Sequence, residues 1–255
     1  MTFSTATGGG RAAPARLTER DLHGLVFTAE MYGVQLDLLA GLLSVAPEGA
    51  GRVAARWRRL GYADSARIGP GRPWVWLTRR GLTACGLRYQ AVPPALSRLA
   101  HLRAVAAVRL ALESASGYRQ AEGYWRSERR LRARMGGRVG LREHIPDAEI
   151  HFPNGRGVPY AGECWAVEAE LTRKTVIRTA AIMRELLART ADYGSPAAET
   201  AALGRPPRHA RVLYLCSAAA RPTVTRAAGT LGALAARIEI RELPPAAALD
   251  APGQS

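Results

Sequence analysis

Acidic residues in two neighbouring segments of the chain have the types and spacing of a metal-dependent site. Pro146-Asp147 begins one segment of alternating polarity, and Glu168-Ala169-Glu170 lies in the next one. Because side chains alternate along a strand, Glu168 and Glu170 are expected on one face, within reach of Asp147 if the strands pair. Mg²⁺ prefers oxygen ligands, and a bound cation can activate water and stabilise charge on phosphate. The carboxylates of Asp147, Glu168 and Glu170 are therefore candidates for binding a divalent cation.

Further residues could complete this acidic site or neutralise it. Glu128 is another candidate acid, His151 alternates in phase with Asp147, and Lys174 could bring an ammonium group back towards the carboxylates. The alternative is a solvated polar face on an edge hairpin, where two glutamates need no special role. In that case the glutamates would be paired by the nearby basic residues Arg173, Arg178 and Arg184.

The elements that position these residues form a sheet with helices between its strands. Pro153-Asn-Gly-Arg-Gly157 is a hairpin turn signal between the two alternating segments. The basic stretch 124–137, which ends in two glycines, is expected to be a helix. The other expected elements are strands at 144–152 and 165–172, a helix at 174–190, a strand at 211–217, a helix at 222–237 and a strand at 238–243, with room for one more strand near 158–160.

The first ninety residues have the order of elements found in a winged helix-turn-helix. Thr18 followed by Asp21 predicts the start of a helix that runs to about residue 32. A strand ends at the phrase VWLTRRGL, which resembles the junction between the wing and the next helix in winged DNA-binding domains. The expected elements are helices at 36–43 and 50–60, a strand at 63–68, a turn at 69–73, a strand at 74–77 and a helix from 78.

The third of these helices carries an arginine stripe. Val53, Trp57 and Leu60 can pack inward, while the spacing of three arginines puts them on another, exposed face. An exposed basic stripe is suited to the major groove, and a wing tip is suited to phosphate. The alternative is a solvated basic helix in a domain that binds proteins. The candidate DNA-binding residues are Arg52, Arg56, Arg58, Arg59 and the wing residue Arg72.

The charge of the chain favours a polyanionic partner. It carries 36 basic and 21 acidic residues, a net charge of +15. Residues 1–90 hold +6, residues 91–143 hold +7 and residues 144–255 hold +2. This asymmetry indicates two modules, and the net positive charge together with the winged helix-turn-helix pattern predicts double-stranded DNA as the partner. Because Lys174 is the only lysine, the arginines could also reflect genome composition, and the chain would then be a protein-interaction module.

Several other classes of protein are excluded by motifs that the sequence lacks. Three widely spaced cysteines make no disulfide framework and no metal spacing with the five histidines, so a reducing compartment, the cytoplasm, is expected. The chain contains no apolar run of membrane-spanning length, no phosphate-binding P-loop, no nucleophile elbow at Ser217 and no histidine pair of the HUH relaxase type.

The residues Pro146-Asp147 and Glu168-Ala169-Glu170 resemble the motif of the PD-(D/E)xK nuclease superfamily, with its restriction-endonuclease-like fold. The resemblance implies an αβββαβ core from about 127 to 243, with Asp147 and Glu168 as ligands of Mg²⁺. The lysine of the motif is replaced by Glu170, and Lys174 could supply the missing ammonium. An active nuclease and an inactive DNA-binding scaffold therefore both stay open.

Taken whole, the chain resembles the replication-relaxation family of plasmids and integrative elements. The resemblance rests on LTERDLHGLVFTAEMYGV, LTRRGL, SERRLRARM, PDAEI and WAVEAELTRKT, in that order. It implies a DNA-binding protein of plasmid replication or mobilisation, with replication or relaxosome proteins, or a second copy of the chain, as further partners. The expected fold class is α+β: tail 1–16, winged helix-turn-helix 17–90, linking helix 91–120, α/β restriction-endonuclease-like domain 121–243 and tail 244–255.

Overall fold

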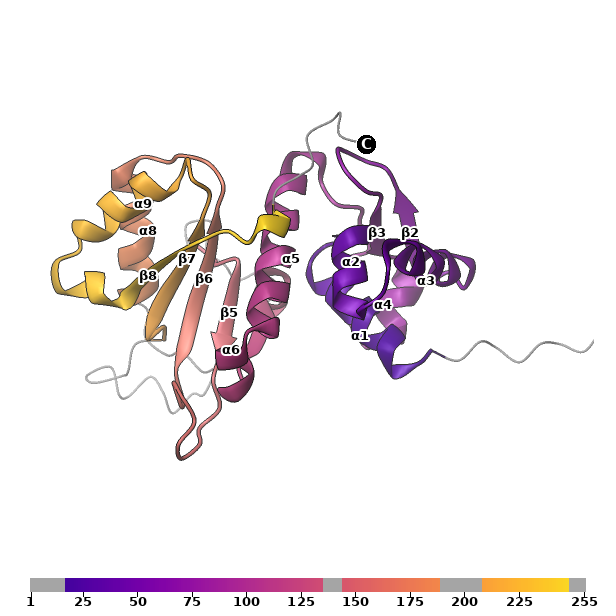
Figure 1. Cartoon of the computed structure of the whole chain (residues 1–255), viewed down its shortest axis with the longest axis horizontal. Helices are drawn as coiled ribbons and strands as arrows, with labels where there is room; N and C mark the ends of the chain where they lie inside the picture. Colours follow the sequence, from indigo (N-terminus) through magenta and orange to yellow (C-terminus); the bar gives the residue numbers. More distant parts are fainter. Residues whose placement is uncertain (1–16, 135–143, 189–207, 248–255) are drawn as a thin grey trace, which may run out of the picture.

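The computed structural model describes residues 17–134, 144–188 and 208–247. The chain is a mixed α and β protein, and its larger sheet contains both parallel and antiparallel strands. Two separate sheets lie on either side of a central helix (Figure 1). The expected tail at 1–16, and residues 248–255 of the expected tail at 244–255, lie outside the described residues. In the part of the chain that the structure describes, no helix is both long enough and apolar enough to cross a membrane.

The N-terminal part, residues 17–90, packs four helices around a small antiparallel sheet with the strand order β1-β3-β2. Trp57 and Trp74 are fully buried there. Helix α3 starts three residues earlier than expected, because Pro47 fits the first turn of a helix. The elements are α1 (Glu19–Glu30), β1 (Val34–Gln35), α2 (Leu36–Leu43), α3 (Pro47–Arg59), β2 (Ala63–Ala66), β3 (Trp74–Leu77) and α4 (Arg79–Ala84).

Local capping explains where α1 and α4 begin. The Thr18 hydroxyl accepts from the Asp21 backbone, and the Asp21 carboxylate accepts from the Thr18 backbone, which forms a reciprocal capping box. Thr78 caps α4 by accepting from the Gly81 backbone. The close fit of Gly81 against the Tyr62 carbonyl, where a Cβ would lie 1.9 Å from the oxygen, joins α4 to the hairpin.

The C-terminal part is a five-stranded sheet with the strand order β4-β5-β6-β7-β8. Strands β4, β5 and β6 pair antiparallel, and β6, β7 and β8 pair parallel. Helices α8 and α9 cover one face and α5 (Leu99–Ser114) covers the other, so β6 is buried along its whole length (Figure 1). The elements are β4 (Tyr124–Ser127), α7 (Glu128–Arg134), β5 (Ala148–His151), β6 (Cys164–Glu170), α8 (Val176–Ala188), β7 (Arg211–Cys216), α9 (Arg221–Gly229), a 3-10 helix (Gly232–Arg237) and β8 (Ile238–Glu242).

The basic stretch 124–137 was expected to be one helix, but its described residues, 124–134, form strand β4 followed by the short helix α7. Its first residues alternate between the two faces of the sheet, and Trp125 lies opposite Ile150 of β5. Pairing with β5 and burial of the indole outweigh the helical pattern of the arginines that follow. The segment 158–160, where a further strand had room, forms turns instead.

Helix α5 (Leu99–Ser114) is the centre of the molecule rather than an exposed linker (Figure 1). A 3-10 turn (Leu96–Arg98) precedes it and α6 (Ser116–Gln120) follows it. Its buried Arg103 donates to Gln35 at 2.6 Å and to both oxygens of Asp37 at 3.0 and 2.7 Å. Buried Arg129 of α7 donates to the carbonyls of Ala29 and Gln90. These arginines hold the two parts together and are not accessible to phosphate, contrary to what their charge suggested.

Residues 244–247, which were expected to belong to a flexible tail at 244–255, are instead ordered. Pro245–Ala247 forms a 3-10 turn against α5, and Ala247 is only 4% exposed. After β8 the chain crosses the sheet face that α5 covers and reaches this turn beside α5 (Figure 1). An apolar alanine-rich segment lowers its exposed apolar area by packing on α5, which explains why Pro245–Ala247 is ordered.

Candidate functional site

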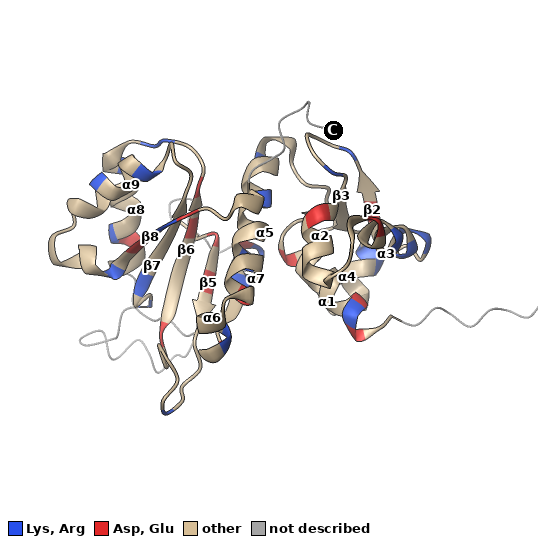
Figure 2. Cartoon of the chain, viewed as in Figure 1, with Lys and Arg blue, Asp and Glu red and all other residues tan. Residues whose placement is uncertain are grey.

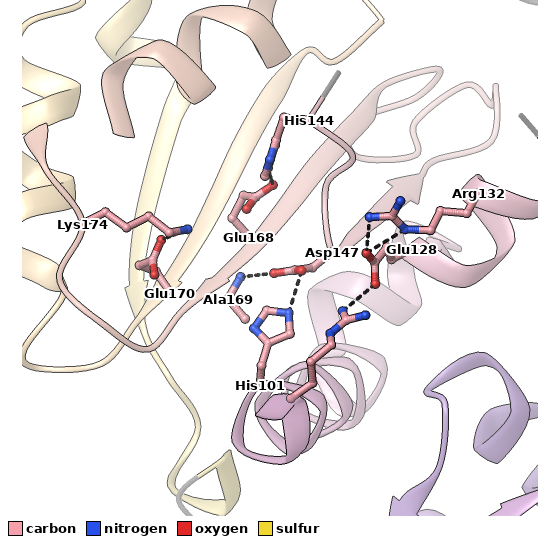
Figure 3. Close-up of polar contacts among 10 residues, drawn as sticks. His101, Glu128, Arg132, His144, Asp147, Glu168, Ala169, Glu170 and Lys174 are labelled. Carbon is pink, nitrogen blue, oxygen red and sulfur yellow. Dashed lines mark hydrogen bonds and ion pairs between the residues drawn. The ribbon is translucent and has the colours of Figure 1, made fainter. Parts of the chain in front are cut away.

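Asp147 lies just before β5 and is held on both carboxylate oxygens. Oδ2 accepts from the backbone N–H of Ala169 at 2.8 Å, and Oδ1 lies 2.8 Å from Nε2 of His101 on α5 (Figure 3). The pairing of Ala148 with Val167, continued by one residue, places Asp147 beside Glu168. The carboxylate therefore sits where β5, β6 and α5 meet.

Glu168 is a buried carboxyl group, 5% exposed, in the middle of β6. Its Oε1 lies 2.7 Å from Nε2 of His144 (Figure 3). Burial raises the pKa of Glu168 to about 7 and the charge of Asp147 adds to the rise, while the hydrogen bond from His144 opposes it. A carboxyl group that titrates near neutral pH, beside a second carboxylate, is typical of functional sites.

Glu170 and Lys174 form an ion pair at the end of β6. The Lys174 Nζ lies 2.5 Å from Glu170 Oε2 (Figure 3). Lys174 therefore neutralises Glu170, the residue that replaces the lysine of the nuclease motif, and its charge also lowers the pKa of Glu168. The ammonium group is close to the acidic residues, as the sequence suggested, but its direct contact is with Glu170.

Two histidines that the sequence analysis did not assign to the site contact its carboxylates. Burial alone would lower the pKa of His101, but the hydrogen bond and charge of Asp147 outweigh burial and raise it. The pKa of His144 is raised in the same way by Glu168, against the effect of burial. His144 lies three residues before Asp147, which is a usable signal, whereas only the packing of α5 brings His101 to the site.

Glu128, the further candidate acid, starts α7 and is engaged elsewhere. Its carboxylate accepts from Arg98 at 2.8 Å and from Arg132 at 2.9 Å (Figure 3). It shares with Asp147, His101 and Tyr32 the lining of a narrow pocket between the N-terminal part and the sheet. Glu128 therefore borders the site without a direct hydrogen bond to Asp147 or Glu168.

Among the described residues, the one group of three or more potential metal ligands that converges includes neither Asp147 nor Glu168. Glu149, His151 and Cys164 have ligand atoms within 4.8 Å of one another, and all three are buried. His151 therefore lies with Cys164. The alternation of polarity had suggested that it would join Asp147, but it does not. The sequence spacing of cysteines and histidines missed this group, because its ligands come from two strands that pair across a long connection.

On the N-terminal part, the predicted DNA-binding arginines differ in their engagement. Arg52, Arg58, Arg59 and Arg72 are exposed. Arg56 instead pairs with the buried carboxylate of Asp21, which also accepts from Nε1 of Trp57 at 2.8 Å. Figure 2 shows basic residues gathered along α3. The exposed arginine stripe on α3 is thus narrower than expected, because Arg56 is held by Asp21 of α1.

In comparisons with protein-family models, with curated proteins and with solved structures, no match to this chain was found.

Proposed function

We propose that this protein binds double-stranded DNA through α3 of the N-terminal part. The observation that carries the proposal is the position of Arg52 and Arg59, which are exposed on the side of α3 opposite the fully buried Trp57. Arg58 is exposed on the flank of the same helix. The order of α1, β1, α2, α3, β2 and β3 is that of a winged helix, in which the third helix enters the major groove.

The β2–β3 hairpin supports a second contact with DNA. The Gln35 side chain donates to the carbonyls of Pro70 and Arg72 at 2.9 and 3.0 Å and so holds the hairpin tip. Gln35 itself accepts from Arg103 of α5. An arginine on a tip held in this way loses less conformational freedom when it binds phosphate, so Arg72 is the wing contact in the proposal.

The strength of binding should depend steeply on salt. If the stripe, the tip and neighbouring basic residues neutralise about six phosphates, affinity falls roughly 10³-fold between about 50 and 200 mM monovalent salt. If the chain is instead a protein-interaction module whose charge reflects genome composition alone, we expect no such steep dependence of DNA binding on salt.

Replacing Arg52 and Arg59 with alanine should weaken binding to a DNA duplex by about tenfold and reduce the salt slope by about 2. Fluorescence anisotropy with a labelled duplex at several salt concentrations measures both quantities. The matched control is Arg178→Ala with Arg226→Ala, which removes the same charge from exposed positions of α8 and α9. If both double variants lose the same affinity, general charge rather than α3 is responsible, and the proposal is wrong.

We assign this binding to replication or mobilisation of a plasmid or integrative element, as the resemblance to the replication-relaxation family implies. In this assignment the C-terminal part is a platform for replication or relaxosome proteins, or for a second copy of the chain. A pull-down with the complete relaxosome of a plasmid that encodes such a chain tests it. Retention of the relaxosome proteins on the wild-type chain is expected, and a pull-down that retains none of them would contradict the assignment.

A second candidate function is a Mg²⁺-dependent nuclease, favoured by the position of Asp147 beside Glu168. The order α5, β4, β5, β6, α8 and β7, with β6 and β7 parallel, supports an αβββαβ core that the short helices α6 and α7 interrupt. The donor set is suited to Mg²⁺, since both groups offer carboxylate oxygens. Asp147 would orient a cation with Glu168, and Lys174 would stabilise charge on phosphate once Glu170 released it.

Nicking of supercoiled plasmid tests this second function. With Mg²⁺ or Mn²⁺, wild-type protein should convert supercoiled to open-circular DNA, and Asp147→Asn or Glu168→Gln should reduce the rate at least 100-fold, because each removes a ligand charge (roughly the effect of losing one catalytic group). Nicking that is equal in all three samples would indicate a contaminating nuclease, and nicking by none would leave DNA binding as the function.

A further inference from the structure

Three potential metal ligands meet on the face of the large sheet that α8 covers. His151 of β5 and Cys164 of β6 are directly opposite each other in the antiparallel register. Glu149 lies two residues before His151 and therefore points to the same face. The exposed fractions of the three residues are 0% for Glu149, 8% for His151 and 5% for Cys164, so the group is enclosed by protein.

The distances within this group are close to those of a tetrahedral zinc site. Sγ of Cys164 lies 3.6 Å from Nε2 of His151. With Zn–S near 2.3 Å and Zn–N near 2.0–2.1 Å, tetrahedral geometry places these two atoms about 3.6 Å apart. Nε2 of His151 lies 2.9 Å from Oε2 of Glu149, and a shared zinc ion would widen this contact to about 3.3 Å, a small side-chain movement.

We propose that Glu149 Oε2, His151 Nε2 and Cys164 Sγ form a binding site for zinc. The donor set decides the class of metal, since thiolate and imidazole suit zinc and other late divalent transition metals, whereas Mg²⁺ requires oxygen. Thiolate and carboxylate together balance the two charges of the ion. Three protein ligands leave the fourth position for water or for an added donor.

The groups around Glu149 are arranged as outer partners of such a site. Its other oxygen, Oε1, lies 2.9 Å from Nε2 of His209 and 2.6–2.7 Å from Arg208. Nδ1 of His209 donates to the Leu186 carbonyl at 3.0 Å. With Oε1 held in this way, Oε2 is left facing His151 and the metal position. Outer partners that orient a ligating carboxylate typically affect metal affinity by about 10–100-fold.

Metal binding at this site must release a proton. Burial raises the pKa of the Cys164 thiol, and the charge of Glu149 adds to the rise. The S–H bond therefore breaks only as the Zn–S bond forms, and the proton passes to the buffer. The proton that His151 Nε2 shares with Glu149 moves to the other ring nitrogen by exchange with solvent. No electron is transferred, and affinity should rise with pH.

Cobalt substitution tests the proposal on the 255-residue chain. After removal of metal by a chelator, one equivalent of Co²⁺ should produce a thiolate-to-cobalt charge-transfer absorption and the visible bands of a tetrahedral site. One equivalent of Zn²⁺ should abolish these bands. Zinc at about 100 times its dissociation constant should raise the unfolding midpoint by about 5 °C or more.

Single-residue variants distinguish this site from adventitious binding. Cys164→Ser should abolish the charge-transfer absorption, and His151→Gln should lower affinity for Co²⁺ at least tenfold while keeping the thiolate. Cys216→Ser, which removes another buried cysteine of the same sheet, should leave the spectrum unchanged. Wild-type protein without the charge-transfer band, or Cys216→Ser that loses it while Cys164→Ser keeps it, would overturn the proposal.

Discussion

Replacing Arg109 with leucine is expected to lower the free energy of unfolding by about 3 kcal/mol. Arg109 is buried in α5, lies over the ring of Phe27 at 4.6 Å and donates to Glu30 at 3.4 Å and to Glu113 at 2.8 Å. Burial raises the pKa of Glu30 although Arg109 and Arg130 oppose the rise. The leucine variant would leave the Glu30 charge buried and without its nearest cation.

Urea unfolding at pH 8 measures this effect, and two further variants check its cause. Arg178→Leu, on the exposed face of α8, should change stability by no more than about 0.5 kcal/mol. Adding Glu30→Gln to Arg109→Leu should restore part of the loss, because it removes the uncompensated charge. If Arg109→Leu and Arg178→Leu unfold at the same urea concentration, α5 does not hold the two parts together in the way described.

Replacing Glu168 with glutamine is expected to alter how the free energy of unfolding depends on pH. The loss of stability between pH 5 and pH 8 should be smaller in the variant by roughly 2 kcal/mol. The pKa of Glu168 is raised from 4.5 to about 7, so the folded chain binds more protons than the unfolded chain in this range. The contribution of Glu168 to stability is therefore present below pH 4.5 and is lost as the pH rises towards 7. The pKa of His144 is also raised in the folded chain, so its contribution to stability changes in the same direction. This contribution is lost as the pH rises through the pKa that His144 has in the folded chain.

Chemical denaturation of parent and variant at pH 5 and pH 8 checks this expectation. The free energy of unfolding of the variant minus that of the parent should be larger at pH 8 than at pH 5. Titratable groups that both proteins share cancel from this difference. Glu242→Gln, which changes a carboxyl group that is 77% exposed, should show no such dependence. A parallel pH profile for parent and Glu168→Gln would mean that Glu168 ionises as easily in the fold as in the unfolded chain.

The site shows why spacing along the chain locates some of its members and not others. Asp147 and Glu168 could be placed together in advance, because alternation within strands and the hairpin signal at 153–157 limit the ways in which two neighbouring strands can pair. His101 has no local pattern that points to Asp147. Its position depends on α5 packing across the sheet, and that packing brings together residues far apart in the chain.

The arginines illustrate the same difference for charge. Composition and the distribution of charge along the chain indicate a polyanionic partner, and helical periodicity places Arg52 and Arg59 on the outer side of α3. Periodicity does not reveal that Arg103 and Arg129 are internal. Their side chains are buried because the carbonyl and carboxylate groups of the N-terminal part need donors once α5 and α7 cover them.

From its amino-acid order alone, the chain specifies most of its helices and strands, its capping residues and the face on which Glu168 and Glu170 lie, because each depends on contacts between near neighbours. Three features follow from long-range packing: the strand at Tyr124–Ser127, the histidines that hold the acidic residues, and the convergence of Glu149, His151 and Cys164. Burial outweighs local preference in each of them, since pairing across the sheet both hides apolar surface and supplies partners for polar groups that water can no longer reach.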